Sequence, residues 1–147
     1  MRVAVGSDHA GLQLKVALVN RLVELGHQVE DVGTHTTASC DYPDFAVAVG
    51  QQVADGQADR GLLVCGSGLG MAIAANKVAG VRAVTVSDTF SAHAPREHND
   101  ANVLCLGERV VGPGLARDIL DIWMGASVEG GRHERRVEKI RALDRAR

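Results

Sequence analysis

The sequence is poor in aromatic residues and has no excess of positive charge. Aromatic residues make up 3% of its 147 residues, and the formal net charge at neutral pH is −2. Nucleic-acid binding needs a basic surface and often aromatic side chains that stack on bases, so the composition argues against a nucleic-acid partner. With 46% hydrophobic residues the chain is too apolar to be disordered. It is long enough to fold without a disulfide or a metal.

Long apolar segments are also absent. The longest run without a charged residue, Gly61 to Asn76, is interrupted by glycines and is shorter than the ~18 apolar residues that a membrane span needs. The residues before Asp8 leave no room for the apolar core of a signal peptide. The three cysteines, Cys40, Cys65 and Cys105, are an odd number without a CxxC pair, which favours free thiols in a reducing compartment. We therefore expect a cytoplasmic protein without a membrane partner.

Short apolar segments alternate along the chain with longer segments of helical periodicity. Strands are expected at 3–5, 29–32, 62–65, 81–86 and 103–106, and helices at 12–25, 43–56, 70–77, within 88–97 and at 115–124. This alternation predicts an α/β fold, a Rossmann-like three-layer αβα sandwich with a five-stranded parallel sheet. No repeat or linker divides the chain, so residues 1–147 are expected to form a single domain. Ligands in such folds bind at the carboxyl ends of the strands.

The C-terminal segment, about 127–147, differs from the rest because it is basic. Arg132 and Arg136 lie on one stripe of an expected helix, and Ile140 and Leu143 lie on another. A Gly-Gly pair precedes this helix and suggests a hinged arm. A solvated surface helix and an arm that docks on a partner subunit both fit the pattern.

A cysteine and three alternating glycines lie at a strand-to-helix junction, in the segment Cys65-Gly66-Ser67-Gly68-Leu69-Gly70. The N–H groups of such a loop, together with the start of the next helix, can bind an anion or a developing oxyanion. The same field stabilises a thiolate. A tight turn around a buried structural cysteine explains the pattern equally well. Met71 replaces the last glycine of G-x-G-x-x-G, which argues against a dinucleotide site.

Residues that suit acid–base and phosphate chemistry lie near other strand ends. Asp8 and His9 follow the first strand, and His98 precedes the last one, from where we expect it to reach the same edge of the sheet. Arg132 and Arg136 are four residues apart, so both face one side of a helix and suit a phosphate group. The other histidines show no ligand spacing, so neither a metal nor an organic cofactor is expected. These parts together suit the transfer of a proton beside a carbonyl through an enediolate.

Seven motifs carry a resemblance to a known family and cover essentially the whole chain. They are Gly6–Gly11, Asp41–Pro43, Cys65–Gly70, Ala74–Lys77, His98–Asn102, Gly107–Gly112 and Glu129–His133. In these motifs the chain resembles the type B ribose-5-phosphate isomerases, whose family also contains allose-6-phosphate and galactose-6-phosphate isomerases. The resemblance implies reversible conversion of D-ribose 5-phosphate to D-ribulose 5-phosphate. It also implies a homo-oligomer, either a dimer or a tetramer, with active sites at the subunit interface.

The resemblance further implies a role for individual residues. Cys65 would remove the proton, His98 would open the sugar ring, and Ser67 would lie near the hydroxyl groups. Met71 stands where one branch of the family has a glutamate base, which places this chain on the cysteine side. Pro95 is expected to kink or end the helix before His98. The implied substrate-binding residues are Asp8, His9, Tyr42, Gly66, Gly68, Leu69, Gly70, Asn99, Arg109, Arg132 and Arg136.

Three other interpretations stay open at this point. The substrate is a different phosphorylated sugar, such as allose 6-phosphate, galactose 6-phosphate or a tetrulose phosphate, since a change of one carbon needs only a small change in the pocket. Alternatively, the chain binds a sugar phosphate without converting it. The last interpretation is a redox protein that uses Cys65, although no motif places Cys40 or Cys105 to act as its partner.

Overall fold

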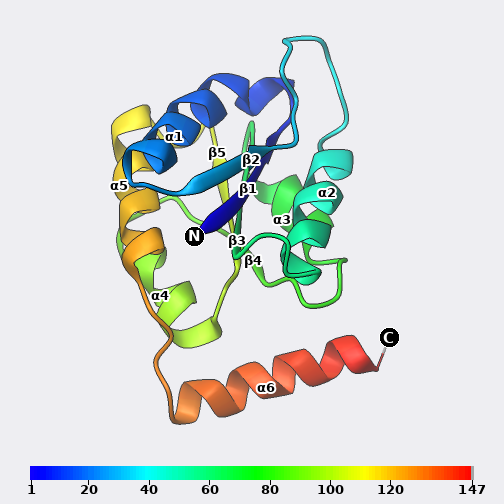
Figure 1. Ribbon diagram of the computed structural model, residues 1–147, viewed down its shortest axis with the longest axis vertical. Coiled ribbons are helices and arrows are strands. Elements are labelled where there is room, and N and C mark those ends of the chain that lie inside the picture. Colours follow the sequence, from blue (N-terminus) through cyan, green and yellow to red (C-terminus); the bar gives the residue numbers. More distant parts are fainter. Residues whose placement is uncertain (147) are drawn as a thin grey trace.

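Helices cover both faces of a parallel β-sheet in the computed structural model, which describes residues 1–146 (Figure 1). The strands are β1 (Arg2–Ser7), β2 (Gln28–Asp31), β3 (Arg60–Cys65), β4 (Ala83–Thr85) and β5 (Val103–Gly107). They form one sheet in the order β2-β1-β3-β5-β4, and every neighbouring pair is parallel. The predicted three-layer α/β fold with a five-stranded parallel sheet is confirmed.

The helices divide between the two faces of the sheet. They are α1 (Leu12–Glu24), α2 (Tyr42–Ala54), α3 (Leu69–Ala75), α4 (Phe90–Asn99), α5 (Pro113–Gly125) and α6 (Arg132–Arg145), and a 3-10 turn, His9–Gly11, precedes α1. Side chains alternate along β3, because successive residues of a strand point to opposite faces. Leu62 and Val64 join the core under α1, α4 and α5, whereas Leu63 and Cys65 join the core under α2 and α3. Because a hydrophobic core covers each face of β3, its residues 62–65 are apolar on both faces and form one continuous apolar run in the sequence.

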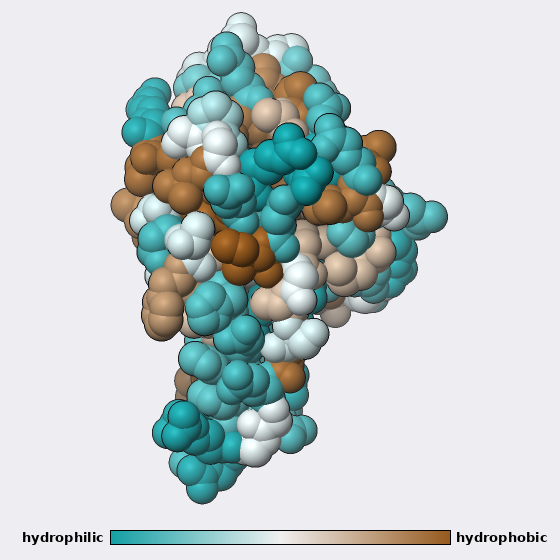
Figure 2. Space-filling view, turned by 90° about the vertical axis from the view of Figure 1, so that its left-hand side faces the viewer, coloured by the Kyte–Doolittle hydropathy of each residue, from teal (hydrophilic) through white to brown (hydrophobic). Residues whose placement is uncertain are grey.

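The C-terminal helix α6 lies outside the sandwich and packs on α4 (Figure 1). Its inward side chains, Val137 and His133, are buried, while most of its other residues are exposed. The part of the molecule that protrudes below the body in Figure 2 is mostly hydrophilic. The helix α4 continues past Pro95 to Asn99, so the prediction that this proline ends the helix is wrong. Within residues 1–146, no helix is both long and apolar enough to cross a membrane.

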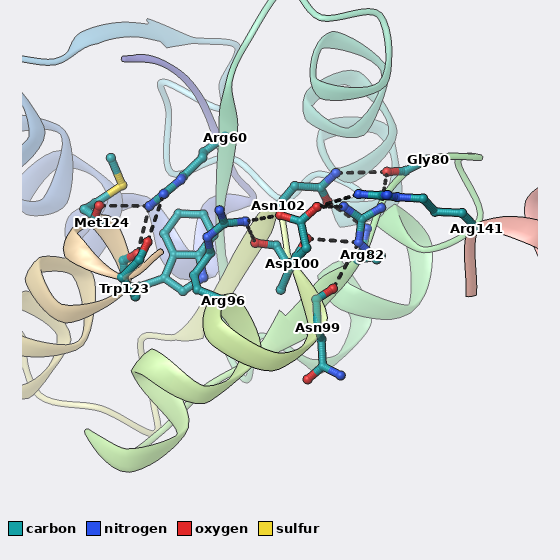
Figure 3. Close-up of polar contacts among 12 residues, drawn as sticks. Arg60, Gly80, Arg82, Arg96, Asn99, Asp100, Asn102, Trp123, Met124 and Arg141 are labelled. Atoms are coloured by element: carbon teal, nitrogen blue, oxygen red, sulfur yellow. Dashed lines mark hydrogen bonds and ion pairs between the residues drawn. The ribbon is translucent and has the colours of Figure 1, made fainter. Parts of the chain in front are cut away.

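One carboxylate connects α4, β4 and α6. Asp100 adopts a left-handed backbone conformation, with φ of 48°, directly after α4. Its side chain forms ion pairs with Arg96 at 2.9 Å, Arg82 at 2.8 Å and Arg141 at 2.9 Å (Figure 3). Because Arg82 precedes β4 and Arg141 belongs to α6, the network fixes the arm against the amino-terminal edge of the sheet.

A buried arginine fixes the end of α5. The guanidinium of Arg60 donates to the carbonyl oxygens of Trp123 at 2.8 Å and Met124 at 3.0 Å (Figure 3). A third bond, of 3.2 Å, reaches the carbonyl oxygen of Ala126. These carbonyls lie at the C-terminal end of a helix, where partial negative charge accumulates. Burial lowers the pKa of Arg60 to about 10. Arg60 thereby holds the segment that leads to α6.

Candidate active site

A groove of about 390 Å³ opens at the carboxyl edge of the sheet, where the loops after β1, β3 and β5 meet. Parallel strands bring the residues that follow them to one edge, so this position was expected from the strand pattern. The groove is lined by residues from all three loops and from the start of α2, namely Asp8, His9, Ala10, Tyr42, Cys65, Gly66, Ser67, Gly70, Arg109 and Val110.

The Cys65 thiol lies at the bottom of this groove and is held by the glycine loop. Cys65 ends β3, and 5% of the residue is exposed. Its Sγ accepts a hydrogen bond of 3.1 Å from the backbone N–H of Gly68. Gly68 has φ of +79°, and a Cβ atom there would lie 2.9 Å from the carbonyl carbon of Leu106. The loop therefore needs glycine to direct this N–H at the sulfur.

Ser67 belongs to the same loop, and its hydroxyl bonds to the backbone two residues further along. Its Oγ accepts a hydrogen bond of 3.3 Å from the N–H of Leu69, the first residue of α3. The Leu69 side chain is 59% exposed. Leu69 therefore contributes its backbone to the loop and presents its side chain to solvent.

Asp8 combines a structural bond with a free acceptor. The residue is buried, and its Oδ1 accepts from the N–H groups of Ala10 at 2.9 Å and Gly11 at 3.2 Å. These bonds cap the turn that precedes α1 and fix the orientation of the carboxylate. Within residues 1–146 the second oxygen, Oδ2, accepts no hydrogen bond. Asp8 therefore offers an oriented acceptor to a hydroxyl group in the groove.

His9 presents a hydrogen-bond donor to the groove. Its Nδ1 accepts a bond of 3.2 Å from the backbone N–H of Cys40, in the loop before α2. A nitrogen that accepts carries no proton, so the proton of the neutral ring is on Nε2. The guanidinium of Arg109 lies over Gly66, where a Cβ atom would be 3.3 Å from its Nη1. His9 and Arg109 give this part of the groove the donors that a phosphate group needs.

Tyr42 covers the far side of the glycine loop. A Cβ atom at Gly70 would lie 2.6 Å from Cζ of the Tyr42 ring, so the ring packs directly on the glycine backbone. Tyr42 begins α2 and is 40% exposed. The ring thus forms one wall of the groove.

Sequence reasoning missed Glu108. Its Oε2 accepts a bond of 3.0 Å from the N–H of Leu14, in the first turn of α1. The N-cap of α1 is Gly11, which has no side chain to accept from this turn, and the carboxylate of Glu108 takes that place from the loop after β5. Because Arg109 follows directly, the bond also positions the arginine. The sequence signal for such a contact is the start of α1, where Gly11 offers no side chain to cap the helix.

The remaining predicted site residues lie at the other edge of the sheet. His98 and Asn99 end α4, which returns the chain from the carboxyl edge to the amino edge. The Asn99 carbonyl oxygen accepts from Nε of Arg82, just before β4 begins. At a rise of about 3.3 Å per residue, the two ends of β3 are roughly 16 Å apart. The expectation that His98 reaches the edge that holds Cys65 within one chain is therefore wrong.

This second group gathers around the start of α6. The rings of His98 and His133 stack, with centroids 4.3 Å apart and planes 12° apart. Burial, followed by the nearby charges of His98 and Arg132, lowers the pKa of His133. Arg132 and Arg136 are exposed on the same helix. At one edge of the sheet the chain thus carries a thiol, a carboxylate and hydrogen-bond donors that suit a phosphate group. At the other edge it carries a histidine and two arginines.

Comparisons with known proteins place the chain in a family. A protein with 51% identity over 99% of this chain and 98% of its own length is the ribose-5-phosphate isomerase B of Escherichia coli. A relative from Mycolicibacterium smegmatis, 48% identical over 85% of this chain and 84% of its own, is named D-erythrulose-4-phosphate isomerase 2. The structure of Clostridium thermocellum ribose-5-phosphate isomerase B superposes with a TM-score of 0.97, with 49% identity and 99% of both chains covered. The ribose/galactose isomerase family model matches residues 3–140, and the chain belongs to this family.

Proposed function

We propose that the protein interconverts D-ribose 5-phosphate and D-ribulose 5-phosphate through an enediolate. The observation that carries this proposal is the Cys65 thiol, hydrogen-bonded by Gly68 N–H in a groove that also holds Asp8, His9 and Arg109. One small polar ligand in this groove would then contact a base, an oriented carboxylate and hydrogen-bond donors for its phosphate group. The relatives named ribose-5-phosphate isomerase B cover nearly the whole chain and support the same reaction.

The chemistry uses one base and returns the proton that it removes. The Cys65 thiolate takes the proton from C2 of the open-chain aldose, and the electron pair moves to the carbonyl oxygen on C1. The resulting enediolate lies against the N–H groups of the glycine loop, which stabilise its negative charge. A proton moves from the C2 hydroxyl to the C1 oxygen, and the Cys65 thiol gives its proton to C1. The product is the 2-ketose, and the thiolate is regenerated.

A second copy of the chain completes the site in this proposal. Ring opening needs a base for the C1 hydroxyl and an acid for the ring oxygen, and His98 suits both tasks. His98 lies at the other edge of its own chain, so the partner subunit's His98 would act on the sugar bound near Cys65. The partner subunit's Arg132 and Arg136 would join His9 and Arg109 at the phosphate. The active oligomer is therefore at least a dimer.

An exposed apolar stripe beside the glycine loop supports this contact between copies. Leu69 is 59% exposed and Ile73 is 65% exposed, and the two residues are one turn apart on α3. Exposed apolar side chains that lie together mark a surface that another protein covers. The stripe begins at the loop that holds the Cys65 sulfur, so a copy that covers it also reaches the groove.

A shorter sugar phosphate is the second candidate substrate, because one relative with 48% identity is named D-erythrulose-4-phosphate isomerase 2. The experiment that tests the proposed function is a direct isomerase assay in the presence of EDTA. The substrates are D-ribose 5-phosphate, D-erythrulose 4-phosphate, D-allose 6-phosphate and D-galactose 6-phosphate. We expect the highest kcat/KM with D-ribose 5-phosphate. A higher value with another sugar phosphate would keep the chemistry and change the substrate. Binding without turnover of any of them would favour a non-catalytic sugar-phosphate-binding protein.

Replacing Cys65 tests its role as the base. We expect Cys65→Ala to abolish turnover while the protein stays folded and still binds a phosphorylated sugar. Cys105→Ala is the matched control, since Cys105 is the other fully buried cysteine and lies on the neighbouring strand. Burial raises the pKa of the Cys105 thiol, which keeps it protonated and unable to act as a base. Activity of Cys65→Ala within tenfold of the parent, about 1.4 kcal/mol of barrier, would exclude Cys65 as the base.

A further inference from the structure

Three side chains of types that bind metal ions gather where α4 meets α6. Donor atoms of His98, Glu129 and His133 all lie within 4.8 Å of one another. Oε2 of Glu129 is 3.4 Å from Nε2 of His133 and 3.9 Å from Nε2 of His98. The three residues come from the end of α4, the segment before α6, and the first turn of α6. No single sequence motif joins them, so the cluster exists only in the fold.

The separations in this cluster are close to those that a metal ion requires. Zinc sites have metal–ligand distances of about 2.0–2.2 Å and tetrahedral angles, so their donor atoms lie ~3.3–3.5 Å apart. Glu129 and His133 already meet this condition. The His98 ring has to turn out of its stack on His133, because two parallel rings do not direct their lone pairs at one point. The His98 side chain is 40% exposed and has room for this rotation.

His133 and the backbone of Glu129 are held in place by their surroundings. His133 is buried, with 8% of the residue exposed. The backbone N–H of Glu129 donates a bond of 2.9 Å to the carbonyl oxygen of Glu97, which ties this segment to α4. The Glu129 side chain is 55% exposed, so the side chains of Glu129 and His98 turn when an ion binds. The neighbouring cations Arg132 and Arg136 repel a metal ion and limit its affinity.

We propose that His98, Glu129 and His133 bind a divalent ion of the zinc class, with water in the remaining positions, and that the ion inhibits the enzyme. Two imidazoles and one carboxylate favour Zn²⁺, Co²⁺ and Ni²⁺ over Mg²⁺ and Ca²⁺, which prefer oxygen ligands. An ion on Nε2 of His98 engages the imidazole that the proposed ring opening needs. The inhibition rests on the function proposed for His98, whereas the binding of the ion does not.

A cobalt titration tests the binding separately from catalysis. Co²⁺ is added to protein from which metals have been removed with EDTA, and binding is followed by the visible absorption of the bound ion. Glu129→Gln removes one ligand, and Glu134→Gln is the matched control, because it removes a carboxylate from the same end of α6 outside the cluster. We expect Glu134→Gln to bind like the parent and Glu129→Gln to bind at least ~tenfold more weakly. Equal binding by the parent and Glu129→Gln would overturn the proposed site.

Cys65 lines the groove, carries a thiol that can bind a metal ion, and needs its own control. We expect Cys65→Ala to bind Co²⁺ with the same affinity as the parent, because its sulfur is not one of the three donors. Weaker binding by Cys65→Ala, with Glu129→Gln unchanged, would move the ion to the thiol and overturn the assignment.

The inhibitory part is tested by adding Zn²⁺ to the isomerase assay without EDTA. Each protein is compared with its own metal-free rate, so that any change in basal activity cancels. We expect the inhibition curves of the parent and Glu134→Gln to coincide, and that of Glu129→Gln to shift to at least ~tenfold higher Zn²⁺. If Co²⁺ binds as expected but Zn²⁺ leaves the rate unchanged, the inhibitory part of the proposal is wrong. If no isomerase activity is found at all, the cobalt titration still decides the site.

Discussion

At the residue scale, the strand ends around the groove approach one another too closely for some side chains. A Cβ atom at Gly107, the last residue of β5, would lie 2.6 Å from the carbonyl carbon and oxygen of Ser67. Backbone atoms cannot rotate away, so Gly107→Ala has to displace the loop that holds the Cys65 sulfur. We expect a loss of about 1–3 kcal/mol in the free energy of unfolding, measured by urea denaturation. We also expect a loss of isomerase activity at temperatures where the variant is folded.

Gly114→Ala is the control for this prediction. Gly114 lies in the first turn of α5, and a Cβ atom there would have no neighbour within 4 Å. Alanine is favoured over glycine in a helix by up to ~1 kcal/mol, so this variant should be as stable as the parent or more stable. An unchanged stability and activity of Gly107→Ala would contradict the close approach of β5 to the glycine loop.

Residues of the site were predictable where one local signal carried them. The segment around Cys65 joins an apolar strand to glycines and a helix, and the carboxyl-edge rule then places Asp8 and Arg109 beside it. The contacts of Glu108 and Cys40 were not predictable in this way. Each is a bond to a residue far away in the sequence, Leu14 and His9, and depends on how the loops pack.

At the element scale, an ion pair joins two helices that cover the same face of the sheet. Arg21 of α1 donates two bonds to Asp121 of α5, of 2.8 and 2.7 Å. These hydrogen bonds lower the pKa of Asp121 from 3.8. A carboxyl group with a lowered folded-state pKa stabilises the fold above its unfolded value and loses that effect as the pH falls through the folded value. We expect Asp121→Asn to lower the free energy of unfolding by about 0.5–1 kcal/mol at pH 7.

The pH dependence distinguishes this ion pair from a simple loss of packing. The difference between the parent and Asp121→Asn should shrink in urea denaturation as the pH falls below 3.8, and it should vanish once the pH is below the lowered folded-state pKa of Asp121. Asp118→Asn serves as the comparison, because Asp118 is exposed on the same helix and forms no ion pair within residues 1–146. A difference between parent and Asp121→Asn that stays constant down to pH 3 would contradict the role given to the charge.

Elements were easier to predict from the sequence than their ends and their order. Leu14, Leu18 and Leu22 are buried on one face of α1, as their spacing indicated. Strand β4 covers only Ala83–Thr85 of the predicted 81–86. The closeness of His98 to β5 in the sequence does not bring it to the carboxyl edge, because α4 runs in the opposite direction to the strands. A helix between two parallel strands returns the chain to the amino end of the next strand.

At the scale of the whole molecule, the proposed function divides one site between the two edges of each chain. The strand order β2-β1-β3-β5-β4 places β5 between β3 and β4, and no local pattern encodes such an order. Asp100 ties the half that contains His98 to α6, whereas the half that contains Cys65 depends on the glycine loop. Under the proposed function, the two halves at opposite edges complement each other only between copies. The proposal thus makes the oligomer part of the active site rather than an addition to it.

Mixing two inactive variants tests this arrangement directly. Cys65→Ala and His98→Asn should each be inactive alone, because every site in each homodimer lacks one group. In a hybrid dimer, the intact Cys65 of one chain faces the intact His98 of the other, so one of the two sites is complete. Random mixing makes half of the dimers hybrid, and roughly a quarter of the parent activity should return. The measurement is the isomerase rate after the two variants are unfolded together and refolded. Each variant refolded alone is the control, and activity of the mixture no higher than these controls would show that the two groups do not meet across subunits.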